Sequence, residues 1–198
     1  MTAHAELAHY RKTPPSNPSA PTSTPAPTGP TGPSAPATRI DRPRPGDGRL
    51  LWRLARDSGT LDLNSAYSYL LWCRDFAGTS AVARDASGRA VGFVSGYLRP
   101  ESPGTLLVWQ IAVDESVRGL GIAGALLDGL SARVAAEHGL SSLETTIAPG
   151  NLASERLFAS YAARHGATLT REVLFAPEEF PDRGYAPEVL HRIGPLRF

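Results

Sequence analysis

The stretch VWQIAVDESVRGLGIAGALLDGL, residues 108–130, decides the fold of this chain. It joins a β-rich apolar run, Leu106 to Val113, to a helix expected to reach about His138. Between them lies the glycine-rich turn Arg118 to Ala123, which lacks the side chains that would keep a ligand away from the backbone. N–H groups at the start of a helix attract an anion, and the helix dipole adds to the attraction. The turn therefore predicts a pyrophosphate site.

The same glycines also fit a second motif. Gly119, Gly121 and Gly124 have the GxGxxG spacing of dinucleotide-binding folds, and Glu144 follows roughly 20 residues later. Two features disfavour a dinucleotide site: residues 114–118 separate the strand from the first glycine, and a strand hairpin precedes the unit. On the turn alone, a third interpretation stays open, in which the glycines only close a helix against a sheet.

The composition of the chain changes near residue 38. Nine of the 18 prolines fall between Pro14 and Pro36, among Ser, Thr, Ala and Gly and with almost no large apolar side chains. Such a segment cannot bury enough apolar surface to fold. We expect residues 1–38 to form a disordered or polyproline-II-like tail and residues 39–198 to form one folded domain.

Charge and cysteine content narrow the classes of function. A net charge of +1 argues against a polybasic binder of nucleic acid or of a membrane surface. No apolar run approaches the roughly 20 residues of a membrane span, and no signal layout opens the chain, so we expect a cytoplasmic protein. The single cysteine, Cys73, excludes an intrachain disulfide and is expected to be buried. Cys73 and five scattered histidines indicate no metal site.

Apolar periodicity and turn residues predict the remaining elements. Their order, with strands before and after the helices, predicts a mixed sheet with helices packed on it in a single domain. The expected elements are a helix starting at Pro45–Gly48, a second helix capped by Ser65, a hairpin of Ser80–Arg84 and Ala90–Tyr97, a turn at Pro100–Gly104, a strand at Ser142–Ile147, a helix from Asn151 to about Arg164, and closing strands at Thr168–Leu174 and Glu188–Ile193.

Two motifs resemble the GNAT acetyltransferase superfamily. One is Arg118-x-x-Gly121-x-Ala123 after an apolar strand, and the other is the helix that begins at Asn151. The resemblance implies an α/β fold with a mostly antiparallel sheet, acetyl-CoA as co-substrate, and a homodimer. It also implies cofactor contacts at Ile111, Val113, Arg118, Gly119, Gly121, Ala123, Gly124, Asn151 and Ser154.

Further stretches resemble one family within this superfamily, the L-2,4-diaminobutyrate acetyltransferases of ectoine biosynthesis, which acetylate the γ-amino group. They lie between about Arg39 and Leu196 and include LDLNS at 61–65, VWQ at 108–110, LETT at 143–146 and EVL at 188–190. The resemblance implies a small diamino acid as substrate and substrate contacts at Asp62, Tyr67, Trp109 and Glu144.

Several positions depart from that family's pattern. Tyr185 stands where a histidine is expected, so either its hydroxyl replaces that contact or substrate affinity is altered. Gly150 stands where a serine is expected. Phe158 stands where many members of the superfamily carry a tyrosine acid.

The chemistry expected of an amine acetyltransferase suggests roles for these residues. A primary ammonium has a pKa of about 10, so it must lose a proton before attack, and Glu144 is the predicted base, directly or through water. Asp62 is expected to pair with an ammonium group. A bulge near Ile111 to Val113 is expected to free a backbone N–H for the oxyanion. Tyr67 or Tyr161 could protonate the leaving thiolate.

Other interpretations remain open on the sequence alone. Trp109 in an apolar strand could belong to the core, and Asp62 beside Asn64 could form only a cap or an Asx-turn. The chain could instead acetylate another small diamine or amino acid, or it could be a non-catalytic module that senses coenzyme A.

Overall fold

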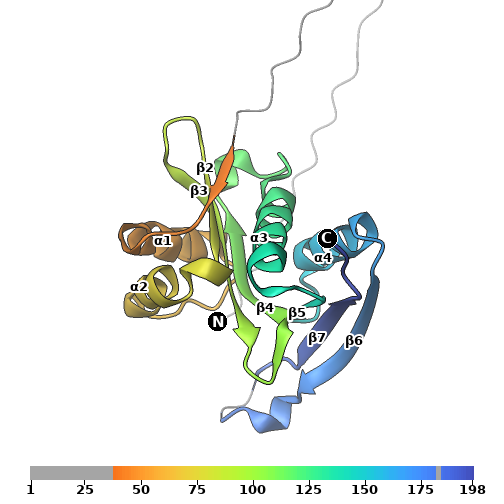
Figure 1. Ribbon diagram of the computed structural model, residues 1–198. Helices are drawn as coiled ribbons and strands as arrows, with labels where there is room; N and C mark the ends of the chain where they lie inside the picture. Colours follow the sequence, from red (N-terminus) through yellow and green to blue (C-terminus); the bar gives the residue numbers. More distant parts are fainter. Residues whose placement is uncertain (1–37, 182–183) are drawn as a thin grey trace, which may run out of the picture. The chain divides into compact units, whose positions relative to one another are not determined.

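The sheet at the centre of the fold has seven strands in the order β1-β2-β3-β4-β5-β7-β6 (Figure 1). The computed structural model describes residues 38–181 and 184–198, so nearly all of the predicted tail lies outside the described residues. Every neighbouring pair of strands is antiparallel except β4 and β5, which confirms the mixed, mostly antiparallel sheet. The strands are β1 Arg39–Asp41, β2 Ala81–Arg84, β3 Ala90–Arg99, β4 Ser102–Val113, β5 Ser142–Ile147, β6 Thr168–Phe175 and β7 Glu188–Gly194.

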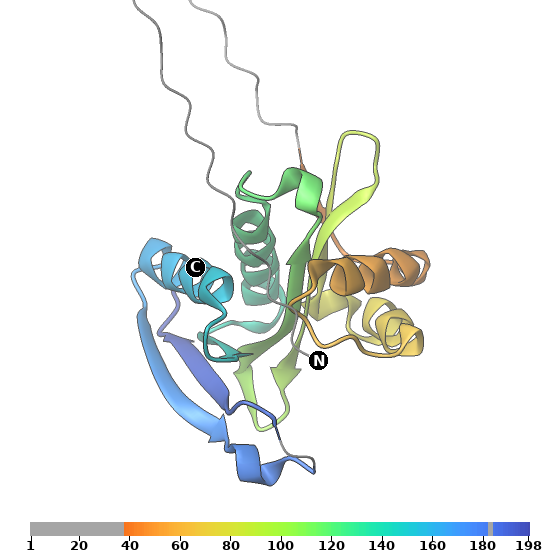
Figure 2. The ribbon, with the colours of Figure 1, turned by 180° about the vertical axis from the view of Figure 1, so that it is seen from behind.

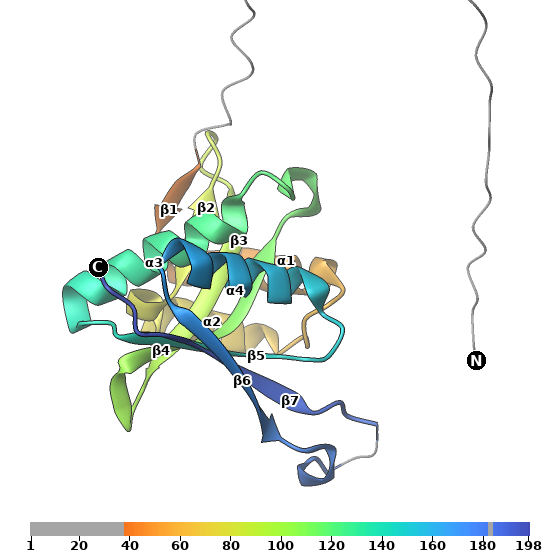
Figure 3. The same ribbon diagram turned by 90° about the vertical axis from the view of Figure 1, so that its right-hand side faces the viewer.

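Helices cover both faces of the sheet. Helices α1 (Gly48–Ser58) and α2 (Ala66–Asp75) lie on one face, and α3 (Ile122–His138) and α4 (Leu152–Arg164) lie on the other (Figures 1 and 3). A core cluster forms on each face. The larger includes Leu126, Leu130 and Phe158, and the smaller is built around Tyr69 and Phe93.

Polar caps fix the starts of α2 and α4. The Ser65 hydroxyl accepts the backbone N–H of Ser68 at 3.3 Å, which confirms the predicted cap of α2. The Asn151 side chain accepts the N–H of Ser154 at 3.2 Å at the start of α4. These caps satisfy donors that have no partner within the helix.

Strand β4 begins earlier than the sequence predicts. The turn between β3 and β4 takes only Pro100 and Glu101, and β4 starts at Ser102, so the predicted turn over Pro100–Gly104 is too long. Its first residues include Pro103, which has no N–H to donate. The ladder to β3 is interrupted there, since Arg99 pairs with Ser102 while the preceding Leu98 pairs with Leu106. A proline is tolerated at such an irregularity.

A second bulge interrupts the middle of β4. Ser95 pairs with Gln110 and the next residue, Gly96, pairs with Val108, so Trp109 is the extra residue. A Cβ at Gly96 would lie 2.6 Å from the Leu107 carbonyl oxygen, which is why this position on β3 requires a glycine. The irregularity lies just before the predicted site at Ile111 to Val113.

The parallel pairing of β4 with β5 ends at Val108 and Thr145. Beyond these residues β4 continues for five residues, to Val113, with only β3 as a neighbour. Seen from behind, β7 and β6 extend the sheet past β5, on the side away from α1 and α2 (Figure 2).

The described part of the chain lacks two kinds of feature. Within residues 38–181 and 184–198, no helix has the length and apolar character needed to cross a membrane. In the same ranges, no three His, Cys, Asp or Glu side chains are grouped so that they could hold a metal ion.

Candidate active site

The glycine-rich turn presents its backbone to solvent. Gly119 and Gly121 have φ values of 80° and 77°, a left-handed conformation that favours glycine, and a Cβ at either would meet nothing within 4 Å. Gly121 is the N-cap of α3, and no side chain caps this helix. The first N–H groups of α3 are therefore left for an anion. Arg118 is exposed beside them, and its Nε donates to the Val113 carbonyl oxygen at 3.3 Å.

Backbone groups near the end of β4 face a gap between β4 and β5, because the two strands no longer pair there. The Asp114 N–H donates to the Val91 carbonyl oxygen at 2.8 Å, so the Asp114 amide points toward β3. Amides alternate in direction along an antiparallel strand, so the amides of Ile111 and Val113 point away from β3. The pairing with β5 has already ended there. Ile111 and Val113 thus offer backbone donors and acceptors to a ligand lying between the two strands.

The N-termini of α3 and α4 lie at the same end of the β4–β5 pair. The two strands are parallel, and each helix follows the carboxyl end of its strand. The gap, the glycine-rich turn and the start of α4 at Asn151 are therefore neighbours. Such an arrangement suits one long ligand with a phosphate-bearing end.

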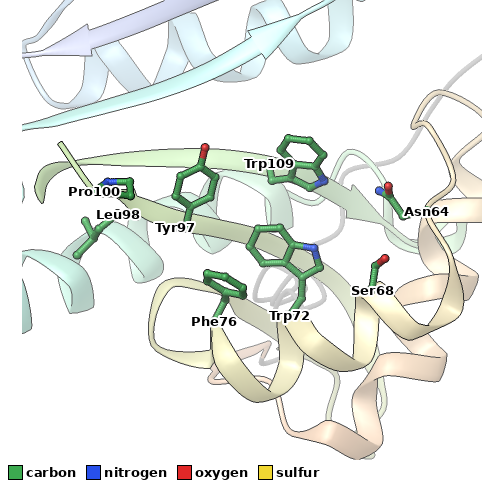
Figure 4. Close-up of a pocket in the computed structure, with 8 residues that line it drawn as sticks. All are labelled: Asn64, Ser68, Trp72, Phe76, Tyr97, Leu98, Pro100 and Trp109. Carbon is green, nitrogen blue, oxygen red and sulfur yellow. The ribbon is translucent and has the colours of Figure 1, made fainter. Parts of the chain in front are cut away.

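A pocket of about 500 Å³ lies between α2 and the strands β3 and β4 (Figure 4). Trp72 stacks against Trp109 with ring centroids 6.3 Å apart, and it lies 6.4 Å from Tyr97. Trp109 is 51% exposed, so it lines the pocket rather than joining the core. The lining residues are Asn64, Ser68, Trp72, Phe76, Tyr97, Leu98, Pro100 and Trp109.

Hydrogen bonds tie the loop before α2 to β4 beside this pocket. The buried Gln110 accepts the Tyr69 hydroxyl at 3.0 Å and donates to the Asp62 carbonyl oxygen at 2.8 Å. Asp62 thus lies next to the bulge, and its residue is exposed. Tyr67 on α2 is 66% exposed and is not one of the lining residues of the pocket.

Glu144 is a buried carboxylate between two arginines. It is 3% exposed. Its Oε2 lies 3.0 Å from Nη1 of Arg99 at the end of β3, and its Oε1 lies 2.8 Å from Nε of Arg192 on β7. The hydrogen bond to Glu144 raises the pKa of Arg192. The guanidinium groups of β3 and β7 thus hold the Glu144 carboxylate in place by charged hydrogen bonds.

Two tyrosines lie differently from what the sequence suggested. Tyr161 is fully buried, its hydroxyl donates to Ser131 at 2.7 Å, and burial raises its pKa to about 12. The expectation that Tyr161 could protonate a leaving thiolate is wrong, because its hydroxyl is buried and donates to Ser131. Tyr185 is 49% exposed and stacks on Phe180 with centroids 4.7 Å apart, within the connection between β6 and β7.

A family model described as the acetyltransferase (GNAT) family matches residues 49–162. The chain belongs to this family. Two GNAT relatives are the L-2,4-diaminobutyric acid acetyltransferases of Streptomyces avermitilis and Streptomyces coelicolor, which are 67% and 65% identical over 158 residues. Each alignment covers 80% of this chain, with 88% and 93% of the respective relative. These matches confirm the family resemblance seen in the sequence.

A solved GNAT structure gives the same result. Diaminobutyrate acetyltransferase EctA from Paenibacillus lautus, in complex with L-2,4-diaminobutyric acid and coenzyme A, is 42% identical to this chain with a TM-score of 0.76. The match covers 82% of this chain and 98% of that chain. The dinucleotide interpretation of the glycine-rich turn is therefore wrong.

The matched GNAT segment ends within α4. It includes the turn, the gap and Glu144, whereas β6 and β7 lie beyond it. Arg192 and Tyr185 therefore lie outside the part of the chain that the family model describes. Sequence reasoning missed Arg99 and Arg192, which are 45 and 48 residues from Glu144, because no local pattern links them to it.

Proposed function

We propose that this chain transfers the acetyl group of acetyl-CoA to the γ-amino group of L-2,4-diaminobutyrate. The product would be N4-acetyl-2,4-diaminobutyrate, formed in ectoine biosynthesis. The observation that carries the proposal is the match to the Paenibacillus lautus enzyme, whose complex holds both diaminobutyric acid and coenzyme A. That match extends over 98% of the solved chain, so it includes the donor and the acceptor sides of the fold.

The donor binds, in this proposal, along the gap and the glycine-rich turn. The open amides at the start of α3, with Arg118, receive the pyrophosphate, and Gly119, Gly121, Ala123 and Gly124 leave room for it. The backbone groups of Ile111 and Val113 hold the pantetheine arm. Asn151 and Ser154, at the start of α4, lie on its other side.

The acceptor binds in the aromatic pocket beside the bulge. Ring faces attract ammonium groups, and Trp72 and Trp109 present stacked rings to the pocket. Asp62 adds a carboxylate next to the bulge for pairing with one ammonium group. Tyr67 and Tyr185, both exposed, complete the contacts that we propose for the substrate.

The chemistry joins the two sites near Trp109. Acetyl-CoA supplies an activated acetyl group as a thioester. Glu144 accepts the proton of the attacking amine, directly or through a water molecule, so that the nitrogen can form its bond to the carbonyl carbon. A backbone N–H of Ile111 or Val113 stabilises the resulting oxyanion, which is worth about 3 kcal/mol for one donor. The thiolate leaves readily, since thiols have a pKa of about 8.5.

Replacing Glu144 with glutamine tests the proposed base. We expect kcat to fall by about 10²-fold or more, the usual size of a general-base effect, with the Kd for coenzyme A unchanged. The measurement is release of free thiol from acetyl-CoA with L-2,4-diaminobutyrate. Glu137→Gln is the matched control, since Glu137 pairs with Arg42 outside the site.

Three outcomes of this experiment would be informative. Normal turnover by Glu144→Gln would remove the base assignment. A raised KM with unchanged kcat would instead indicate a role in holding the arginines. A wild-type chain that binds coenzyme A but releases no thiol with any small amine would be a sensor rather than an enzyme.

We also propose that the chain is a cytoplasmic homodimer. Strand β6 lies at the edge of the sheet and carries Val173, Leu174 and Phe175, which are 61%, 38% and 46% exposed. Large apolar side chains gathered on an edge strand favour association with a second chain. The cytoplasmic location follows from the proposed use of acetyl-CoA, a metabolite of the cell interior.

A further inference from the structure

One row of side chains crosses the sheet from the aromatic pocket to the edge of β7. Tyr97 pairs with Leu107, Leu107 with Glu144, and Glu144 with Arg192, so all four side chains point to the same face. Tyr97 lines the pocket, and Glu144 lies two strands away, roughly 10 Å. Arg99 spans this interval, because it starts from β3 and reaches Glu144 at 3.0 Å. Arg99, between the lining residues Leu98 and Pro100, therefore lies at the rim of the pocket, and Glu144 links it to Arg192.

The ion pairs with Glu144 use only some of the N–H donors of Arg99 and Arg192. Arg99 uses Nη1 and Arg192 uses Nε toward Glu144, whereas each guanidinium has five N–H donors. The arginine side chains are 39% and 47% exposed, while that of Glu144 is only 4% exposed. The carboxylate is thus covered, and the remaining N–H groups are accessible.

The two carboxylates that pair with these arginines differ in burial. Two guanidinium groups surround one buried carboxylate, Glu144, and the second carboxylate of the cluster, Glu172, is exposed. Glu172 lies 3.4 Å from Nη2 of Arg192, but its side chain is 60% exposed and solvent weakens such a pair. An anion that approaches these guanidinium groups would meet N–H donors whose directions are set by the pairing with Glu144.

We propose that Arg99 and Arg192, held in place by Glu144, bind the α-carboxylate of the diamino acid substrate. This assignment rests on the proposed function. A guanidinium group matches a carboxylate with two parallel N–H donors, whereas the aromatic rings of the pocket suit the ammonium groups. The substrate is then oriented with its acid end at the arginines and its amines toward Trp109 and the gap. This role is independent of whether Glu144 also accepts a proton.

The assignment predicts discrimination between two closely related amines. Removing the α-carboxylate from L-2,4-diaminobutyrate gives 1,3-diaminopropane, which keeps both amines and their spacing. We expect the wild-type chain to favour diaminobutyrate in kcat/KM by about 10- to 100-fold, the range that one or two charged hydrogen bonds supply.

The experiment compares Arg99→Gln and Arg192→Gln with the wild-type chain on both amines, by thiol release. In each variant we expect kcat/KM for diaminobutyrate to fall about tenfold or more relative to kcat/KM for 1,3-diaminopropane. The preference for the amino acid should therefore fall toward one. Arg42→Gln is the control, because Arg42 is also a partly exposed arginine in an ion pair, with Glu137.

Each contrary outcome has a distinct meaning. Equal losses on both amines, or no preference in the wild-type chain, would overturn the assignment of the arginines. If Arg99→Gln does not fold, the exposed Arg192→Gln decides, and an unchanged preference in that variant overturns the assignment. Absence of thiol release by the wild-type chain with diaminobutyrate would instead overturn the proposed function.

Discussion

At the scale of the residue, Gly121 shows how one backbone angle shapes the proposed pyrophosphate site. Its φ of 77° is costly for any side chain, although a Cβ would meet no neighbouring atom. We expect Gly121→Ala to lower the free energy of unfolding by about 1–2 kcal/mol and to raise KM for acetyl-CoA, because the turn must shift. Denaturant unfolding and steady-state kinetics measure the two effects.

A matched glycine separates these effects from the loss of a glycine in general. Gly46 also has open space around a built Cβ, but its φ is not in the left-handed region. Gly46→Ala should leave both quantities near their wild-type values. An unchanged KM for acetyl-CoA in Gly121→Ala would contradict the proposed role of the turn.

Cys73 makes stability depend on alkaline pH. Burial, with a smaller effect from Asp47, raises the pKa of its thiol from 9.0 to about 12 in the folded chain. Above pH 9 the unfolded chain loses this proton first, so the contribution to stability is full below pH 9 and disappears as the pH rises to about 12. We expect the free energy of unfolding to fall across this window, and less steeply in Cys73→Ala. Identical slopes in the two chains would contradict this expectation.

The sequence drew attention to Glu144 as a carboxylate in an interior strand, but it did not reveal the arginines that pair with it. A carboxylate in an interior strand is rarely buried without a partner, which is why the position stood out. Its partners come from β3 and β7, and their approach depends on the register of four strands. Local patterns carry no information about such pairings, so the arginines emerge only from the folded chain.

At the scale of the element, the bond from Tyr69 to Gln110 holds α2 and its preceding loop on β4. We expect Tyr69→Phe to cost about 1 kcal/mol of stability, since a buried hydrogen bond is lost, and to raise KM for the diamine as Asp62 loses its support. Unfolding by urea and kinetics with varied diamine provide the test.

Tyr161 offers the matched control for this variant. Its hydroxyl also makes one buried hydrogen bond, to Ser131, but between α3 and α4 on the opposite face. Tyr161→Phe should lose similar stability and keep its KM for the diamine. Equal changes in KM would show that α2 is not specifically anchored.

Elements with strong local signals were predictable, and irregular ones were not. The helix starts at Gly48 and after Ser65, and the strand β5, agree with the sequence, because caps and periodicity are local. The short strand β1 was not predicted, since Arg39–Asp41 has little apolar character and pairs only with β2. The bulge at Trp109 depends on two strands at once.

At the scale of the whole molecule, the exposed apolar edge of β6 predicts the state of association. We expect Val173→Glu to shift the chain from dimer to monomer, because a charge would be buried against the partner. Light scattering after size-exclusion chromatography measures the mass. Phe198→Glu, which changes an equally exposed side chain in the C-terminal segment, should remain a dimer. A monomeric wild-type chain would contradict the proposed homodimer.

The bulge at Trp109 also fixes the face of the sheet to which each side chain of β4 points. Because one residue is unmatched, Trp109 and Gln110 both serve the face that carries α2, whereas a regular strand would send them to opposite faces. Point substitutions leave this assignment of faces intact, and only the insertion or deletion of a residue alters it. Deleting Trp109 would straighten β4 and close the mouth of the gap at once. Over evolutionary time, β4 should therefore tolerate substitutions far better than insertions or deletions.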